Sequence, residues 1–152
     1  MIKKICFVPT ENAALPEINA YKNYLFKKGI LSDVVSVNNI KKIKKYSIVW
    51  KFMGLDIFNH DMNQLIIHEY QSSSTPPFPK IKNKIKTVFN IDPDIRIFQN
   101  KYIENCFKFK ENNLMNYYRP MGVSQDFFNP KLIHDSSKKY DFVYVGSLHK
   151  RK

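Results

Sequence analysis

The stretch KKICFV at residues 3–8 decides the fold class of this chain. It is short and almost continuously apolar, which is typical of a strand that is buried on both faces of a parallel sheet. Four later runs have the same character and are predicted to be strands: SIVWKF at 47–52, LIIH at 65–68, DIRIF at 94–98 and LMNYY at 114–118. Another strand is expected around Val34, Val35 and Val37. Helices between the strands would give an α/β fold with a mostly parallel sheet and flanking helices.

Helix signals lie between these strands. Pro16 suits the start of a helix and Gly29 suits its end, because proline is favoured in the first turn and glycine at the C-terminal cap. Asn38 is a candidate cap for a short basic helix at 41–45. The stretch 80–89 is predicted to be a helix, although its alternating lysines also allow a strand. The apolar residues that share one face of this helix, and that we expect to face the core, are Ile81, Ile85, Val88 and Phe89.

Length and composition limit the possible classes of protein. The chain has 152 residues, enough for one domain or two at most, and its 43% of hydrophobic residues excludes a disordered chain. No apolar run could span a membrane, and the one that follows Lys3 and Lys4 is too short for a signal peptide, so we expect a cytoplasmic protein. Two cysteines, Cys6 and Cys106, cannot build a disulfide framework. Since no cysteine and histidine residues have metal-ligand spacing, no metal site and no bound cofactor are predicted.

The chain is strongly basic, with a net charge of +12. Part of this charge reflects a composition rich in Lys, Asn and Ile, which is typical of AT-rich genomes. A basic protein is attracted to anionic lipid, nucleic acid and phosphorylated ligands. Nucleic acid is not an expected partner, because arginine, whose planar fork matches phosphates and guanine edges, occurs only three times.

Ligands of parallel α/β sheets bind beyond the carboxyl ends of the strands. The loops where we therefore expect a site are 9–15, 53–56, 68–79, 99–101 and 146–152. The chain has no GxGxxG motif after its first strand and no GxxxxGK[ST] motif, which argues against a dinucleotide-binding dehydrogenase and a P-loop NTPase. It also lacks a GxSxG elbow, and the acidic cluster that a flavodoxin-like receiver would need after its early strands.

Three stretches of the chain together match the pattern of one known family. KKICFVPT at 3–10 and YKNYLFKKGILSDVVSV at 21–37 form an opening strand and helix. YRPMGVSQDFFNP lies at 118–130, and YDFVYVGSLHKRK lies at 140–152. In this order and spacing they resemble the first unit, the interdomain hinge and the first strand of the second domain of the family 4 glycosyltransferases. Two departures are Ser124, where the family's hinge has Asp, and Ser147, where it has Arg.

The resemblance implies the GT-B architecture, in which two Rossmann-like domains face a cleft. Residues 1–119 would be the N-terminal Rossmann-like acceptor-side domain, 120–139 the hinge, and 140–152 the start of a donor-binding domain. The implied activity is transfer of a sugar from a nucleotide-sugar donor to a saccharide or lipid-linked saccharide acceptor, of the retaining hexosyltransferase type. The implied setting is bacterial surface polysaccharide biosynthesis at the inner face of the membrane. A chain that ends at Lys152 would by itself be expected to be inactive.

The same resemblance suggests residues for the site. His68 and Glu69, expected directly after the strand at 65–68, would orient and polarise the sugar as charge develops at its anomeric carbon. The simpler interpretation is a loop histidine bonded to a backbone carbonyl and a solvated carboxylate. Candidate acceptor-binding residues, which could equally form turns and helix starts, are Thr10, Glu11, Asn12, Asn100 and Lys101. Candidate donor-phosphate residues are Gly146 and Lys152.

A second hypothesis is a non-catalytic basic α/β module that docks on anionic lipid or on a partner chain. It depends on a run of lysines that would form a membrane-facing surface on the helix at 80–89. A solvated, lysine-rich helix face is the plainer interpretation of the same residues. These lysines are Lys80, Lys82, Lys84 and Lys86.

Overall fold

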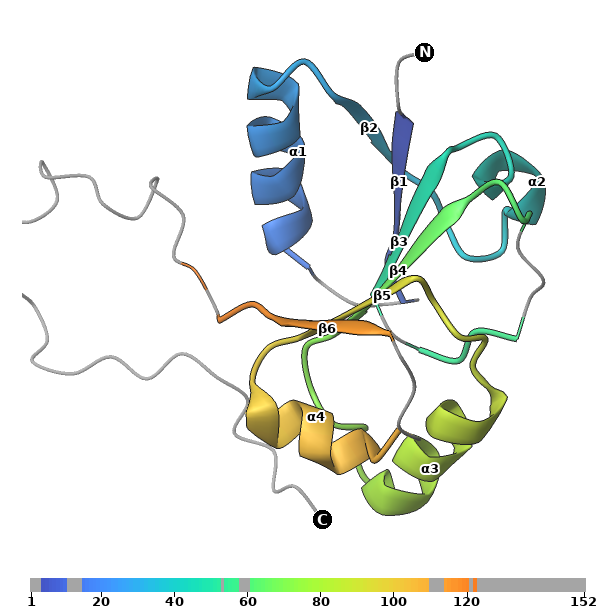
Figure 1. The fold of residues 1–152 in the computed structure, drawn as a ribbon, viewed down its shortest axis with the longest axis vertical. Helices are drawn as coiled ribbons and strands as arrows, with labels where there is room; N and C mark the ends of the chain where they lie inside the picture. The colour runs from blue at the N-terminus through green and yellow to red at the C-terminus, as the bar shows by residue number, and fades with distance from the viewer. Residues whose placement is uncertain are drawn as a thin grey trace, which may run out of the picture. The chain divides into compact units, whose positions relative to one another are not determined.

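Figure 1 shows the chain as a computed structural model, which describes residues 4–10, 15–52, 54–57, 61–109, 114–120 and 122. The chain divides into two compact units, Met1–Pro120 and Met121–Lys152, and all the helices and strands below belong to the first. The predicted hinge at 120–139, apart from Pro120 and Gly122, and the predicted strand at 140–145 lie outside the described residues.

Six parallel strands form one sheet in the order β2-β1-β3-β4-β5-β6. The strands are β1 (Lys4–Val8), β2 (Leu31–Val34), β3 (Ile48–Phe52), β4 (Leu65–Tyr70), β5 (Ile95–Phe98) and β6 (Met115–Tyr118). This arrangement confirms the α/β class with a Rossmann-like parallel sheet. The strand order reverses at β1, which has β2 on one side and β3 on the other. In such sheets the crevice beyond the carboxyl ends of the two strands at this switch point is the usual ligand site.

In the described residues, the helices between the strands are α1 (Glu17–Lys27), α2 (Ile40–Ile43), α3 (Pro79–Phe89) and α4 (Lys101–Phe107). As predicted, α1 starts directly after Pro16 and is followed by Gly29, whose φ of 72° is in the left-handed region that glycine tolerates best. The expected cap of α2 is wrong by one residue. Asn39, rather than Asn38, accepts a hydrogen bond from the Lys42 backbone N–H, at 3.2 Å. None of the helices in the described part of the chain is long and apolar enough to cross a bilayer.

Side chains alternate between the two faces of the sheet along each strand, and both faces bury apolar side chains. On one face, here called the α1 face, Phe7 is fully buried and stacks on Tyr21 of α1, with ring centroids 5.8 Å apart. On the opposite face, Cys6 packs in a cluster with Ile43 of α2. Burial raises the pKa of the Cys6 thiol to about 12, so this thiol stays protonated. Figure 1 shows α1 well separated from α3 and α4, which lie together.

The predicted strand around Val34, Val35 and Val37 lies too late in the sequence. β2 spans Leu31–Val34, and Val35 follows it in the core cluster that contains Ile43. The three valines suggested a strand because they are β-branched and apolar. Val35 lies just after β2, where its backbone N–H still donates to the Phe7 carbonyl of β1 at 2.9 Å, and its side chain is buried in that cluster.

The stretch at 80–89 is a helix, as favoured, but it is turned the opposite way from the prediction. The residues of its apolar stripe are largely exposed: Ile81 by 58%, Ile85 by 41%, Val88 by 64% and Phe89 by 62%. Asn83 faces the domain instead and is 3% exposed. Its side chain accepts a hydrogen bond from the Ser74 backbone N–H and donates to the Cys106 carbonyl. The polar backbone groups of the neighbouring loop and of α4 therefore determine which side of α3 faces inward.

Candidate functional site

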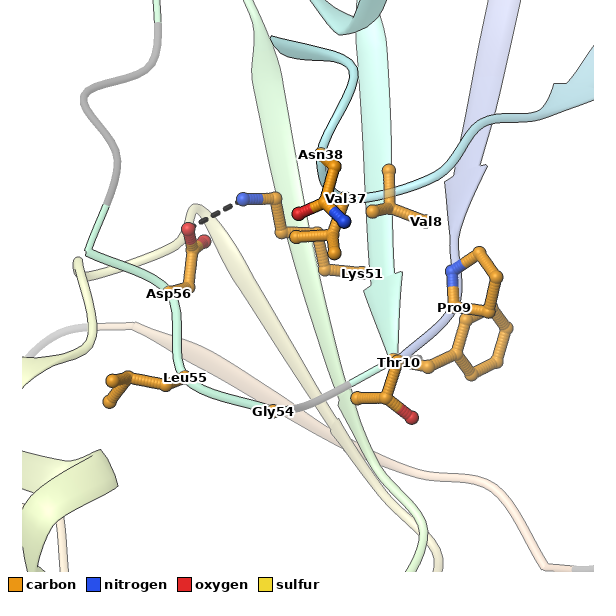
Figure 2. A pocket seen from close by; sticks show the side chains of 10 residues that line it. Val8, Pro9, Thr10, Val37, Asn38, Lys51, Gly54, Leu55 and Asp56 are labelled. Carbon is orange, nitrogen blue, oxygen red and sulfur yellow. Dashed lines mark hydrogen bonds and ion pairs between the residues drawn. The ribbon is translucent and has the colours of Figure 1, made fainter. Parts of the chain in front are cut away.

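A hollow of about 300 Å³ lies at the switch point of the sheet, beyond the carboxyl ends of β1 and β3 (Figure 2). Thr10 follows β1, Asn38 follows β2, and Gly54 and Asp56 follow β3, so its walls come from three successive loops. Lys51, near the end of β3, forms part of its wall. The volume is at the lower end of the range for small-molecule sites, which spans roughly 300–1,000 Å³.

Gly54 allows two walls of the hollow to approach closely. A Cβ atom at this position would lie 3.0 Å from the Cγ2 methyl group of Thr10. That separation is shorter than a normal van der Waals contact, so a side chain at residue 54 would push the loop after β3 away from the loop after β1.

We therefore expect Gly54→Ala to lower the free energy of unfolding by about 1 kcal/mol, which is at the low end for overpacking. The double variant Gly54→Ala/Thr10→Ser lacks the methyl group that causes the clash and should recover most of the loss. Urea unfolding followed by circular dichroism measures both. A single variant as stable as the parent, or a double variant no better than the single one, would contradict this account of the contact.

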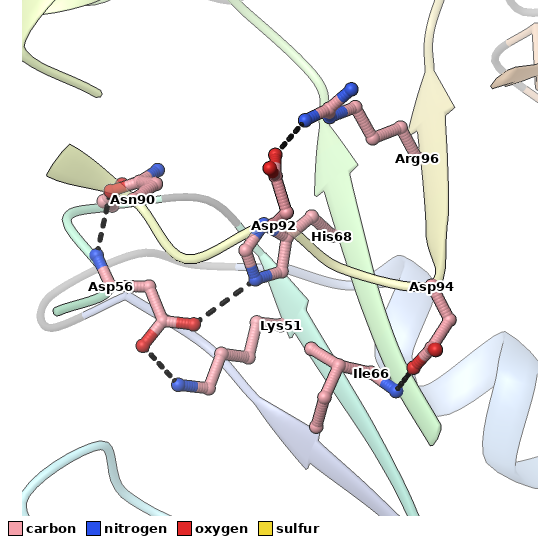
Figure 3. A network of polar contacts seen from close by, with 9 residues as sticks. Lys51, Asp56, Ile66, His68, Asn90, Asp92, Asp94 and Arg96 are labelled. Carbon is pink, nitrogen blue, oxygen red and sulfur yellow. Dashed lines mark hydrogen bonds and ion pairs between the residues drawn. The ribbon is translucent and has the colours of Figure 1, made fainter. Parts of the chain in front are cut away.

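A buried ion-pair network lies behind this hollow (Figure 3). The Lys51 ammonium is 2.5 Å from Oδ1 of Asp56, and His68 Nε2 is 3.0 Å from Oδ2 of the same carboxylate. The exposed fractions of these side chains are 7% for Lys51, 3% for Asp56 and 0% for His68. Burying charged groups is tolerable only when they are paired and hydrogen-bonded, so the Asp56 carboxylate holds this network together.

The loop after β3 is held in place by the segment that follows α3. The Asp56 backbone N–H donates to the Asn90 side-chain oxygen at 2.8 Å, and the Ile91 backbone N–H donates to the Asp56 carbonyl at 2.9 Å. The Asn90 amide also donates to the Gly54 carbonyl, at 3.4 Å. The position of the Asp56 carboxylate is therefore fixed by its backbone as well as by its own ion pairs.

The register of the sheet places three basic residues side by side on the face opposite α1. Lys51 of β3 is paired with His68 of β4, and His68 is paired with Arg96 of β5. The Asp56 carboxylate contacts both Lys51 and His68. The Arg96 guanidinium lies 2.5 Å from the Asp92 carboxylate. The two acidic partners, Asp56 and Asp92, lie in loops beside these three basic residues rather than in the strands of the sheet.

A second buried carboxylate lies on the α1 face. Glu69 is 1% exposed and accepts hydrogen bonds from Trp50 Nε1 at 2.9 Å, from Arg119 Nη2 at 2.5 Å and from Gln71 at 3.1 Å. The Tyr21 hydroxyl is 3.3 Å from it, and burial together with the charge of Glu69 raises the pKa of Tyr21. Burial alone would lower the pKa of Arg119, but the hydrogen bonds and charge of Glu69 outweigh it, and that pKa is raised. Arg119 therefore remains a cation, and Glu69 of β4 links Trp50 of β3 to Arg119, the residue after β6.

The predicted position of His68 and Glu69 is wrong. β4 extends to Tyr70, so both residues lie within the strand rather than after it, and they point to opposite faces of the sheet. The strand continues because each polar side chain finds buried partners, whereas an isolated polar residue would end an apolar run. The His68 Nε2 atom lies 3.0 Å from Oδ2 of Asp56, so a buried carboxylate is a partner of His68.

The other predicted site residues separate into three groups. Thr10 lines the hollow, as an acceptor-binding role would require, while Glu11, Asn12, Gly146 and Lys152 lie outside the described residues. Asn100 caps α4, since its side-chain oxygen accepts from the Ile103 backbone N–H at 2.9 Å. Lys101 is 70% exposed and contacts Glu104 at 2.7 Å and the Tyr118 hydroxyl at 3.0 Å. The structure thus brings Thr10 to the hollow and gives Asn100 and Lys101 structural contacts of their own.

Sequence reasoning did not identify Asn38, Lys51 or Asp56 as site residues. Lys51 carries a usable signal, because a charged residue inside an otherwise apolar strand must have a buried partner. Asp56 lies in the loop 53–56, one of the loops where a site was expected, but neither Asp56 nor Asn38 was singled out, and only the folded structure shows that both line the same hollow.

Within the residues that the structure describes, no group of three or more His, Cys, Asp or Glu side chains is arranged to hold a metal ion. Comparison of the chain with models of known protein families, with curated proteins and with solved structures gave no match. A hydroxyl group, a primary amide and a carboxylate are groups that exchange hydrogen bonds with the hydroxyls of a small polar ligand.

Proposed function

We propose that this chain takes part in the transfer of a sugar from a nucleotide-sugar donor to a saccharide or lipid-linked saccharide acceptor, and that its described domain supplies the acceptor side. The observation that carries the proposal is the hollow at the switch point, where Thr10, Asn38 and Asp56 converge from three loops. These groups suit a ligand with several hydroxyls. The three stretches that resemble the family 4 glycosyltransferases support the same conclusion and suggest the retaining hexosyltransferase type, in surface polysaccharide biosynthesis.

In this proposal the groups around Asp56 have different roles. Asp56 lines the hollow, so its carboxylate would accept a hydrogen bond from an acceptor hydroxyl. His68 is fully buried behind Asp56 and would position that carboxylate rather than touch the sugar. Glu69 would act in the same indirect way, by holding Trp50 of β3 and Arg119, which follows β6. We keep His68 and Glu69 in the proposed site as positioning residues.

The test is a titration of the uniformly ¹⁵N-labelled chain with glucose, galactose, N-acetylglucosamine and short oligosaccharides of these sugars. We expect at least one of them to shift the amide resonances of Thr10, Asn38 and Gly54. Asn38→Leu should weaken that binding by roughly tenfold, because a buried hydroxyl would lose its partner. Asn19→Leu, at an exposed position on α1, is the matched control and should bind like the parent. If no saccharide shifts these amides, the hollow is not an acceptor site.

Transfer itself is measured in the source organism. Replacing the gene with one that encodes Asn38→Leu should reduce the amount of surface polysaccharide, whereas Asn19→Leu should leave it unchanged. Normal polysaccharide in the Asn38→Leu strain, with the variant protein present at parental level, would count against the proposal. We also propose that the protein works in the cytoplasm at the inner face of the membrane.

A further inference from the structure

Helix α3 leaves four apolar side chains that share one face largely exposed to water. Its stripe of Ile81, Ile85, Val88 and Phe89, here called the α3 stripe, is between 41% and 64% exposed at each residue. Next to it, Phe78 is 69% exposed. Apolar surface on this scale usually marks a site of interaction with a protein or a membrane.

Lysines border the α3 stripe on both sides. With 100° of rotation per residue, Lys80 and Lys84 lie one turn apart on one side of the stripe, and Lys82 and Lys86 lie on the other. The first turn of α3 contains no acidic residue, and neither does the rest of its sequence, PKIKNKIKTVF. Lys86 is half-buried over the Phe107 ring, and burial lowers its pKa. Lys82 donates a hydrogen bond to the Thr75 carbonyl at 3.1 Å, so the exposed Lys80 and Lys84 are the lysines best placed to meet a surface. α3 thus presents an apolar band between two cationic borders.

A wide hollow between α3 and α4 adjoins the same surface. Its volume is about 1000 Å³, and Val88 of the α3 stripe forms part of its wall. The charged residues that line it are Lys80, Lys84, Arg96, Lys108 and Asp92. Four cations against one carboxylate make the hollow positively charged, and the buried Arg96 guanidinium lies against the Phe109 ring at 4.1 Å. The positive charge of this hollow would attract an anionic group while the neighbouring α3 stripe contacts an apolar phase.

We propose that α3 docks on an anionic lipid membrane. The α3 stripe enters the boundary between headgroups and acyl chains, Lys80 and Lys84 lie among the lipid phosphates, and the hollow beside α4 takes a headgroup. An interfacial helix needs this combination of an apolar face and lysine-rich borders. A second copy of the chain would bring the same positive charge to the interface and be repelled, so charge complementarity favours anionic lipid. This inference does not depend on the proposed sugar transfer, since it uses a surface away from the switch-point hollow.

The test is co-sedimentation of the full chain with vesicles of phosphatidylcholine, with and without phosphatidylglycerol, at low and high salt. We expect binding to the anionic vesicles that weakens as salt is added. Lys80→Gln/Lys84→Gln should weaken it by roughly 25-fold, or about fivefold for each lysine. Ile81→Ser/Ile85→Ser should weaken it by roughly tenfold or more, because two buried apolar side chains are lost.

Matched controls are available on α1, which also exposes lysines and aromatic residues. Lys27→Gln/Lys28→Gln removes the same charge, and Phe26→Ser removes a side chain that is 75% exposed; both should bind like the parent. Equal binding to neutral and anionic vesicles, or equal loss in the α1 and α3 variants, would overturn the proposal. So would a dimer in sedimentation velocity that Ile81→Ser/Ile85→Ser dissociates, because the stripe would then be covered by protein.

Discussion

Replacing Glu69 with alanine is expected to lower the free energy of unfolding by about 3 kcal/mol, the cost of breaking a buried ion pair by removing one partner. Glu69 is 1% exposed, and its loss would leave Trp50 Nε1 and the Arg119 guanidinium without the acceptor they share. We place the effect at the lower end of the usual range because Arg119 is 28% exposed and can turn toward solvent. Urea unfolding of the parent and the variant, followed by circular dichroism, measures the difference.

Glu104→Ala is the matched control for this prediction. Glu104 also accepts hydrogen bonds from several donors, namely Lys101, Asn116 and the Tyr118 hydroxyl. Its partners are exposed, however, and pairs at the surface contribute about 1 kcal/mol or less. If Glu69→Ala were no more destabilising than Glu104→Ala, the cluster on the α1 face would not link β3, β4 and the residue after β6 as we describe.

Much of the sheet could be predicted from the sequence, because a strand buried on both faces needs a short and nearly continuous apolar run. The runs KKICFV at 3–8 and SIVWKF at 47–52 predicted β1 and β3 to within a residue for this reason. Helix α1 was equally predictable, since Pro16 and Gly29 act through local backbone geometry that does not depend on the rest of the fold. Local preferences and the tertiary structure agree at all these positions.

The site was less predictable because its residues break the local pattern and are compensated from a distance. His68 and Glu69 interrupt an apolar strand, and the sequence alone suggests that the strand ends there. In the fold, Arg119 reaches Glu69 from 50 residues further along the chain, and Asp56 reaches His68 from a loop after another strand. No periodicity or spacing rule could find such pairs.

The orientation of α3 could not be predicted from the sequence either. Its apolar residues have the spacing of a helix face, and that pattern normally indicates the core. The domain side of α3 must satisfy polar groups of Ser74 and Cys106, and Asn83 is the residue that can do so. The apolar face is therefore directed outward, where only another phase or another molecule can cover it.

The second large effect is expected at the ion-pair network beside the switch-point hollow. Asp56→Ala should lower the free energy of unfolding by about 4 kcal/mol, because the variant removes the carboxylate that the buried Lys51 ammonium and the His68 ring both contact. Asp56→Asn keeps the shape and part of the hydrogen bonding but loses the charge, so a smaller loss is expected. Urea unfolding gives both values.

A double-mutant cycle separates the ion pair from simple loss of packing. Lys51→Met keeps most of the side-chain volume and removes the buried charge, so Asp56→Ala/Lys51→Met should be more stable than Asp56→Ala alone. A coupling energy of about 2 kcal/mol is expected for two groups in direct contact. Additive losses would mean that Asp56 acts through the fold of its loop, which Asn90 also holds, rather than through Lys51. The same double variant tests the proposed acceptor site: it should fold yet bind saccharide more weakly than the parent, since Asp56 lines the hollow and neither of the substituted side chains can replace a carboxylate's hydrogen bond.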